Sequence, residues 1–350
     1  MEIIRSQHHL DCYTSRLLER YFGGMTMGVF DIETMGLNPS LGEVVLAGFL
    51  QVSADGTGLV TQFYAESKQD EPQLLQAISQ KLQEFDYILT FNGKHFDLPF
   101  IAKRAELQGL SSNLTGLCNL DLYLVLHGHS SLKQVTGSLK QKNVEDYMGL
   151  HTDRKDEITG AESVQLYEDY LIETDSHKKD ALKQKILLHN HDDLLQLYRI
   201  LPVLQQTDMH RAMSYLGFPL QGICGWPNLS VSRIRVDFKG VTIDGTYRIP
   251  HGCTGFSYLS YDSGSAPYSC QFTAGGQFQF LIPTQRHKNS HYLQLNRFFD
   301  DWSSLEKYPA CVNGYLILSE DNVSNYLEIN MFTQEFLRRF MEETPCPTAR

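Results

Sequence analysis

The sequence predicts an α/β fold in which a mixed five-stranded sheet flanked by helices is followed by a smaller, mostly antiparallel β domain. Two observations carry this prediction. Between residues 25 and 205, strand-like segments first follow one another at hairpin distance and then alternate with helical patterns, which is typical of a mixed sheet covered by helices. From about residue 230 onward, short alternating segments separated by Gly-containing turns replace the helices.

The elements of the first part are expected in a definite order. Turn signals at Asn38-Pro39 and Asp55-Gly56 separate three opening strands, so the connections between these strands are expected to be hairpins. In sheets of this kind the ligand site lies at the strand ends. The expected order is strands 27–33, 43–52 and 60–65, helix 71–85, strand 87–91, helix 96–108, strand 117–122, and helices over most of 123–204.

A chain of 350 residues is long for one core, so two domains are expected. Segment 326–332 alternates and is assigned to a strand, and a helix is expected at 333–343. Tyr247, Phe256, Tyr258 and Tyr261 either form the core of the second domain or stack on unpaired bases. The predicted division is a leading helical segment at 1–24, an α/β domain at 25–205, a linker at 206–229 and a β-rich domain at 230–350.

Asp31 and Glu33 stand two residues apart in the expected strand 27–33. Residues two apart on a strand project from the same face, so these two carboxylates point together while Phe30 and Ile32 point into the core. An isolated pair of this kind is also compatible with a solvated strand edge. Two later segments favour the interpretation as a metal site.

Asp97 lies in the first turn of a helix that begins just after strand 87–91. The helix dipole stabilises a carboxylate there and holds it at the end of the strand. Asn92 belongs to the Asn-Gly turn between the two elements. Its amide is either a turn residue only or a contact to substrate.

A long helix over 179–204 carries the third acidic segment. Asp193 shares an apolar stripe of this helix and faces inward, whereas Asp192 is expected to be more exposed. His189 lies one turn before Asp193 on the same face, where an imidazole suits a general base for the attacking water. The alternatives are that His189 is only a satisfied polar residue, or that His191 takes this role.

These motifs together resemble the DEDD superfamily of 3′–5′ exonucleases with a ribonuclease-H-like fold. The resemblance covers about residues 20–205 and rests on DIET followed by GL, on N-x-x-x-F-D-x-P-F and on H-N-x-x-D. The interval from His189 to Asp193 is four residues, as in the tyrosine subtype of that superfamily. Segments that narrow the resemblance to the YprB-like bacterial branch are LDLY at 120–123, SLK at 131–133, VEDYMGL at 144–150, Arg154, Gly160 and LYEDYL at 166–171.

The resemblance implies an enzyme, a metal-dependent 3′–5′ exonuclease acting on single-stranded DNA or RNA with two Mg²⁺ or Mn²⁺ ions. It implies that the metal ligands are Asp31, Glu33, Asp97 and Asp193, and that His189 orients or deprotonates water. Thr34 and Leu37 fall where such enzymes contact the terminal nucleotide. Two alternatives remain open: a structure-selective endonuclease, and a non-catalytic factor that binds nucleic acid or assists assembly. The sequence identifies no protein partner.

The net charge of −11 argues against a protein that coats duplex nucleic acid. Seven cysteines without paired metal-ligand spacing predict reduced thiols and a cytoplasmic location. No apolar run of about eighteen residues occurs, so membrane insertion is not expected. Basic residues that either contact phosphates or form solvated helix faces are Lys94, Lys103, Arg104, Lys133, Lys140, Lys142, Lys178, Lys179, Lys183 and Lys185.

Overall fold

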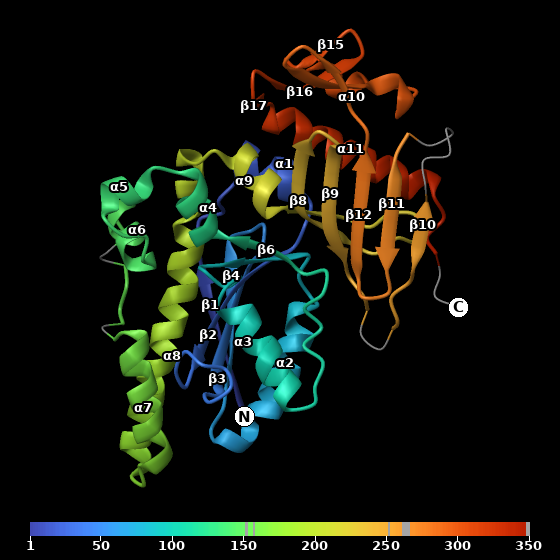
Figure 1. The fold of residues 1–350 in the computed structure, drawn as a ribbon. Helices are drawn as coiled ribbons and strands as arrows, with labels where there is room; N and C mark the ends of the chain where they lie inside the picture. Colours follow the sequence, from blue (N-terminus) through green and yellow to red (C-terminus); the bar gives the residue numbers. More distant parts are fainter. Residues whose placement is uncertain (151–152, 157, 251–252, 261–266, 348–350) are drawn as a thin grey trace. The chain divides into compact units, whose positions relative to one another are not determined.

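A computed structural model describes residues 1–150, 153–156, 158–250, 253–260 and 267–347 (Figure 1). The chain forms two compact units. The N-terminal unit comprises Met1–Leu114 and Asn119–Thr207, and the C-terminal unit comprises Thr115–Cys118 and Asp208–Arg350.

The N-terminal unit is built on a six-stranded mixed sheet with the order β1-β4-β3-β2-β5-β6. Its strands are β1 (Glu2–His9), β2 (Met27–Thr34), β3 (Val44–Val52), β4 (Thr57–Tyr64), β5 (Tyr87–Thr90) and β6 (Cys118–Asp121). Strands β1 to β4 pair antiparallel, and β5 runs parallel to β2. The predicted α/β class and flanking helices are therefore confirmed, with one strand more than expected.

The additional strand is β1, and it corrects the prediction of a leading helix. Glu2–His9 pairs antiparallel with β4 in the register Glu2 to Tyr64. This edge strand contains only two large apolar residues, so it has no strong strand pattern, and long-range pairing decides its conformation. The helix begins later, as α1 (Arg16–Phe22), where the Ser15 side chain accepts a hydrogen bond from the Leu18 N–H.

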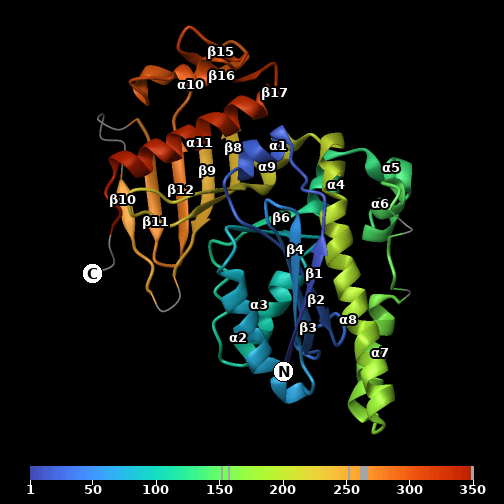
Figure 2. The same cartoon turned by 180° about the vertical axis from the view of Figure 1, so that it is seen from behind.

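Helices cover both faces of this sheet (Figures 1 and 2). On one face lie α2 (Glu71–Leu82) and α3 (Asp97–Leu107), and on the other lie α7 (Gly160–Ile172) and α8 (Ser176–Arg199). Three shorter helices, α4 (Leu122–His129), α5 (Leu132–Thr136) and α6 (Gln141–Tyr147), connect β6 to α7. Between α8 and the 3₁₀ helix η2 (Leu201–Gln206) the chain turns at Ile200.

Helix α8 approaches β3 closely at Gly48, which pairs with Asp31 of β2. A Cβ atom at position 48 would collide with the Asn190 amide and the Leu194 side chain of α8. Glycine is therefore required for this close approach and not for a special backbone angle. As a result, the middle of α8 lies directly over the acidic end of β2.

A buried ion pair fastens α2 to α3. Arg104 donates two hydrogen bonds to the Glu71 carboxylate, from Nε at 2.7 Å and from Nη2 at 2.5 Å. Glu71 also accepts from the Val44 N–H of β3 and from Gln108, and Arg104 donates to the Pro39 carbonyl. Arg104 is thus a structural residue, although the sequence placed it among the candidate phosphate contacts.

The C-terminal unit contains a six-stranded antiparallel sheet in the order β10-β11-β12-β9-β8-β7. Its strands are β7 (Phe218–Leu220), β8 (Leu229–Asp237), β9 (Gly240–Tyr247), β10 (Tyr258–Ser260), β11 (Ser269–Thr273) and β12 (Gln277–Ile282). A smaller sheet follows, made of β13 (Gln285–His287), β14 (Ser290–Gln294), β15 (Cys311–Val312), β16 (Tyr315–Glu320) and β17 (Val323–Ser324), with short helices η3 (Leu295–Arg297) and α10 (Ser303–Glu306). The predicted antiparallel β domain is confirmed.

Helix α11 (Tyr326–Glu343) lies across the larger sheet of this unit (Figure 1), and its aromatic side chains pack on that sheet. Phe336 and Phe340 contact Phe280, and Phe340 also stacks on Phe272. The helix includes 326–332, which the sequence assigned to a strand. Its buried positions recur at helical spacing, and this periodicity outweighs the short alternation.

The predicted linker at 206–229 is also wrong. It contains α9 (Met209–Leu216) and β7, and Trp226 within it is 4% exposed and packs on Phe272 and Phe340. Tyr247, Phe256 and Tyr258 each contact Phe272, so they belong to the same core, while Tyr261 lies outside the described residues. The seven cysteines, all among the described residues, are free thiols. No helix in the described ranges is long and apolar enough to cross a membrane.

We expect Glu71→Ala to lower the free energy of unfolding by about 3–5 kcal/mol, because it leaves the Arg104 charge unpaired in the interior. Urea denaturation monitored by circular dichroism measures this change. Glu71→Ala combined with Arg104→Met should cost less than Glu71→Ala alone. A double variant as unstable as the sum of the two single variants would show that the pair does not interact.

Candidate functional site

The acidic cavity is a hollow of about 750 Å³ in the N-terminal unit, at the end of β2. Asp31 and Glu33 of β2 line it together, as their two-residue spacing predicts, with Ile32 between them. His189 and Asp193 of α8 line it from the helix side. The strand and the long helix therefore supply the two halves of the site.

Asp97, at the start of α3, is not among the residues that line the cavity. It is 5% exposed, and its Oδ1 accepts a hydrogen bond from the Ile32 N–H at 3.2 Å, so its carboxylate is held at the strand position between Asp31 and Glu33. Asp31 is held from the other side, because its Oδ2 accepts from the Asn190 amide at 2.9 Å. Backbone and side-chain donors thus fix two of the four acids before any ligand binds.

Glu33, His189 and Asp193 each offer an atom to one small region, within 4.8 Å of one another. His189 Nε2 lies 3.7 Å from Glu33 Oε1 and 3.6 Å from Asp193 Oδ2. The helix spacing of four residues places His189 and Asp193 on the same face, as the sequence predicts. This is the group of described residues that has the geometry to hold a metal ion.

Burial of the four acids shifts their protonation, and repulsion between them adds to the shift at Asp31 and Glu33. Burial, followed by the charges of Asp97, Asp193 and Glu33, raises the pKa of Asp31 well above its ordinary value. Burial also raises the pKa values of Glu33 and Asp97 to about 7, and burial raises the pKa of Asp193 despite His189 and Arg154. Without a cation, Glu33 and Asp97 therefore hold protons up to about neutral pH.

An aspartate that sequence reasoning missed orients the histidine. Asp156 Oδ2 lies 2.6 Å from His189 Nδ1, on the ring edge opposite the acidic cavity. Burial alone disfavours the Asp156 carboxylate, but hydrogen bonds from His189 and Arg154 lower its pKa to about 2. Burial lowers the pKa of His189, yet Asp156, Asp193 and Glu33 outweigh it and raise that pKa.

Arg154 joins this aspartate to the acids. Its guanidinium donates to Asp156 Oδ1 at 2.6 Å, to Asp193 Oδ1 at 2.5 Å and to both oxygens of the buried Glu145. The sequence drew attention to Arg154 as part of a motif but assigned it no role. Local sequence patterns do not show that residues 154 and 156 meet residue 193, because this contact depends on how the loop packs against α8.

Asp192 is 3% exposed, and the expectation of an exposed side chain was wrong. Its Oδ2 accepts from the Lys155 and Asp156 N–H groups, so it fastens the loop that carries Arg154 and Asp156. His191 lies 3.1 Å from Asp192 Oδ1 through Nδ1 and 2.9 Å from His8 Nε2 through its own Nε2. It does not line the acidic cavity, which favours His189 over His191 as the functional histidine.

The three expected substrate contacts fall in two places. Thr34 and Leu37 line the acidic cavity, and Leu37 is 85% exposed. Asn92 has a left-handed backbone with φ of 66° and lies in a neighbouring cavity instead. Its N–H donates to Asp121 at 2.9 Å, so the backbone of Asn92 serves the turn.

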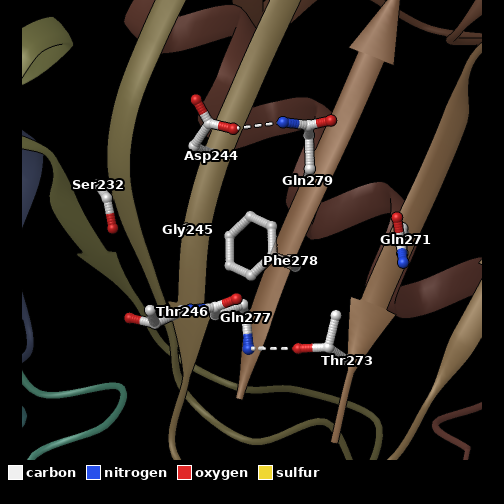
Figure 3. Close-up of a pocket in the computed structure, with 9 residues that line it drawn as sticks. All are labelled: Ser232, Asp244, Gly245, Thr246, Gln271, Thr273, Gln277, Phe278 and Gln279. Atoms are coloured by element: carbon white, nitrogen blue, oxygen red, sulfur yellow. Dashed lines mark hydrogen bonds between the residues drawn. The ribbon is translucent and has the colours of Figure 1, made fainter. Parts of the chain in front are cut away.

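A polar hollow of about 370 Å³ lies on the larger sheet of the C-terminal unit (Figure 3). Its single carboxylate, Asp244, already accepts hydrogen bonds from Gln279 and Arg235 (Figure 3 shows the first). The Gln277 N–H donates to Thr273 in the same way. Because its polar groups pair with one another, this hollow lacks the converging charges of the acidic cavity.

Comparisons with known proteins found similarity between part of this chain and a curated protein, a solved structure and a family model. A segment of 80 residues is 30% identical to a DNA polymerase of Methanocaldococcus jannaschii, and it spans 22% of this chain and 5% of that protein. The structure of the family B DNA polymerase from the hyperthermophilic archaeon Pyrobaculum calidifontis matches 51% of this chain and 24% of its own, with 20% identity and a TM-score of 0.39. The chain thus spans a small part of each relative. Residues 29–205, slightly more than half of the chain, match the model of the RNase H superfamily, and the chain belongs to this superfamily.

Proposed function

We propose that the protein is a metal-dependent 3′–5′ exonuclease of the DEDD type, close to its YprB-like branch, that hydrolyses phosphodiester bonds at single-stranded DNA or RNA ends. The observation that carries the proposal is the meeting of Asp31, Glu33, Asp193 and an aspartate-anchored His189 in one cavity, with Asp97 hydrogen-bonded to the backbone between Asp31 and Glu33. Membership in the RNase H superfamily supports nuclease chemistry at this position.

The acidic cavity fits divalent metal. Asp31, Glu33, Asp97 and Asp193 offer the hard oxygen donors that Mg²⁺ and Mn²⁺ prefer, and burial raises the pKa values of all four even though His189 and Arg154 partly compensate Glu33 and Asp193. Bound there, such ions supply charge stabilisation on the attacking and leaving oxygens of the diester. Both ions are proposed to be held by these four residues.

His189 supplies the proton acceptor. With Nδ1–H donated to the Asp156 carboxylate, Nε2 carries the lone pair and faces Glu33 and Asp193 across the cavity. Water that attacks the phosphorus gives its proton to Nε2, and the imidazolium that forms is stabilised by Asp156. Thr34 and Leu37 line the same cavity, and we place the terminal nucleotide against them.

The decisive experiment incubates the protein with oligonucleotides labelled at the 5′ end, in Mn²⁺. We expect a ladder that shortens from the 3′ end, and Asp97→Asn should produce none. Fixed internal cuts would instead identify an endonuclease. Retention of the oligonucleotide without cleavage would identify a binding factor.

Divalent metal should raise the thermal midpoint, because ions bind the folded site and not the unfolded chain. A ligand at about 100 times its Kd adds about 2.7 kcal/mol to the free energy of unfolding. Asp97→Asn should weaken this response.

In a chelator, the free energy of unfolding of the wild type should fall by at least about 1 kcal/mol between pH 5 and 8. The reason is that the folded Glu33 and Asp97 hold protons up to about pH 7, whereas the unfolded chain releases them near pH 4.5 and 3.8.

The folded state binds more protons than the unfolded chain between pH 5 and 8. The free energy of unfolding therefore decreases as the pH rises. Asp97→Asn removes one of these groups and should flatten the dependence. Differential scanning calorimetry at several pH values, with and without Mn²⁺, provides both measurements. A response to Mn²⁺ as large in Asp97→Asn as in the wild type would exclude Asp97 as a ligand.

His189→Ala should lower the cleavage rate by about 10²- to 10⁴-fold, the usual cost of removing a general base. The matched control is His191→Ala, which lies on the same helix outside the cavity and should cleave almost as the wild type does. Asp156→Asn should lose rate as well, because an amide oxygen stabilises the imidazolium less than a carboxylate does. Single-turnover cleavage rates of the three variants and the wild type are compared. Equal rates for all four proteins would exclude His189 as the general base.

A further inference from the structure

A second hollow, the aromatic cavity, lies beside the acidic cavity in the N-terminal unit. It measures about 560 Å³ and is lined by Phe91, Tyr123, His127, Lys133, Lys140 and Gln141, among others. Lys140 and Gln141 line the acidic cavity as well, so the two hollows share a wall. The two hollows are therefore neighbours on the same unit.

The aromatic cavity presents flat rings that the core does not use fully. Tyr123 and His127 stand one turn apart on α4, with ring centroids 5.6 Å apart and planes 28° from parallel. Phe91 meets the edge of Tyr123 at 5.8 Å. Tyr123 and Phe91 are half-buried and His127 is exposed, so this group offers π surface to a ligand.

Hydrogen bonds fix this aromatic group in place. Asp121, just before α4, accepts from the N–H groups of Asn92 and Lys94 at 2.9 Å each, and it caps the helix at Leu124. The end of β5 and the start of α4 are therefore joined through one carboxylate. Gln141 joins the shared wall to α8 in the same manner, because its amide donates to the Asp193 carbonyl at 3.0 Å.

Positive charge stands around the rings without acidic partners. Across the described ranges, neither the Lys133 nor the Lys140 ammonium forms an ion pair. This is notable in a chain of net charge −11, in which other basic groups of the N-terminal unit, such as Arg154, Lys183 and Arg199, pair with acids. Unpaired ammonium groups beside exposed rings suit a ligand that carries both phosphate and base.

We propose that the aromatic cavity is a subsite for an unpaired nucleotide of the strand whose diester occupies the acidic cavity. The base stacks on Tyr123 and His127, and the flanking phosphates contact Lys140 and Lys133. A base within a duplex has both faces covered by its neighbours, so this subsite selects single-stranded segments. The inference rests on the proposed function, since it takes the acidic cavity as the place of cleavage.

The test measures binding of fluorescent eight-nucleotide single strands by anisotropy, with Asp97→Asn as the background that prevents cleavage. Adding Tyr123→Ala should weaken binding about 5- to 150-fold, the range that corresponds to 1–3 kcal/mol of base stacking. Tyr123→Phe should retain the affinity, because the ring remains. Tyr147→Ala, which changes an exposed tyrosine outside both cavities, should bind as the background does.

An abasic scan identifies the contact. Strands with one abasic position each should show a loss of affinity at one position that disappears when Tyr123→Ala is present. Equal losses in both proteins at every position would overturn the proposal, and so would unchanged binding by Tyr123→Ala. Thermal midpoints for all variants separate a lost contact from a lost fold.

Salt dependence tests the lysines. Lys133→Gln with Lys140→Gln should reduce the slope of log K against log salt by about 1.4, as expected for two phosphates of a single strand. The control pair, Lys178→Gln with Lys185→Gln, changes exposed lysines of α8 and should leave the slope unchanged. Equal slopes for both pairs would remove the phosphate contacts from the proposal.

Wild-type hydrolysis of bis(p-nitrophenyl) phosphate in Mn²⁺ separates this inference from the proposed function, since this small diester has no strand to reach the aromatic cavity. If the protein hydrolyses this diester but no abasic position shows a loss of affinity that depends on Tyr123, the subsite alone is overturned. If one abasic position does show such a loss, but neither the oligonucleotide nor bis(p-nitrophenyl) phosphate is hydrolysed, nucleotide binding in the aromatic cavity is supported and the proposed function is overturned.

Discussion

Mutual repulsion among carboxylates that are withdrawn from water is the constraint on which the N-terminal unit depends. Asp31, Glu33, Asp97 and Asp193 come from a strand and two helices. Burial makes each of them costly to charge, and Asp97 and Asp193 raise that cost further for Asp31 and Glu33. The fold accepts this cost because hydrogen bonds hold the acids in position: the Ile32 N–H on Asp97 and the Asn190 amide on Asp31. The result is a cluster prepared for cations and only partly neutralised by the protein itself.

The partial neutralisation comes from one loop. Arg154 contacts Asp193 and Asp156 while it is held by Glu145, and Asp156 in turn holds His189. The loop is fastened to α8 by Asp192, the neighbour of a site residue in sequence. One helix therefore carries acids with two different tasks: Asp193 faces the cavity, and Asp192 fixes the segment that positions the histidine.

Local patterns predicted the parts of the fold and site that depend on local geometry. The facing of Asp31 and Glu33 follows from strand periodicity, and the shared face of His189 and Asp193 follows from helical spacing. What failed depends on distant contacts. Strand β1 is decided by its pairing with β4, Asp192 is buried by the returning loop, and Asp156 reaches His189 across 33 residues of chain. Trp226 was likewise assigned to a linker, because the residues that bury it, Phe272 and Phe340, are distant in the sequence.

Gly48 has no chemistry of its own, yet it sets the spacing between the two halves of the acidic cavity. The strand contributes Asp31 and Glu33, the helix contributes His189 and Asp193, and only a hydrogen atom at position 48 separates the layers there. Any larger side chain acts as a wedge between α8 and β3 and moves two donors away from the other two without altering any of them. The geometry of the acidic cavity therefore depends on a residue that does not line it.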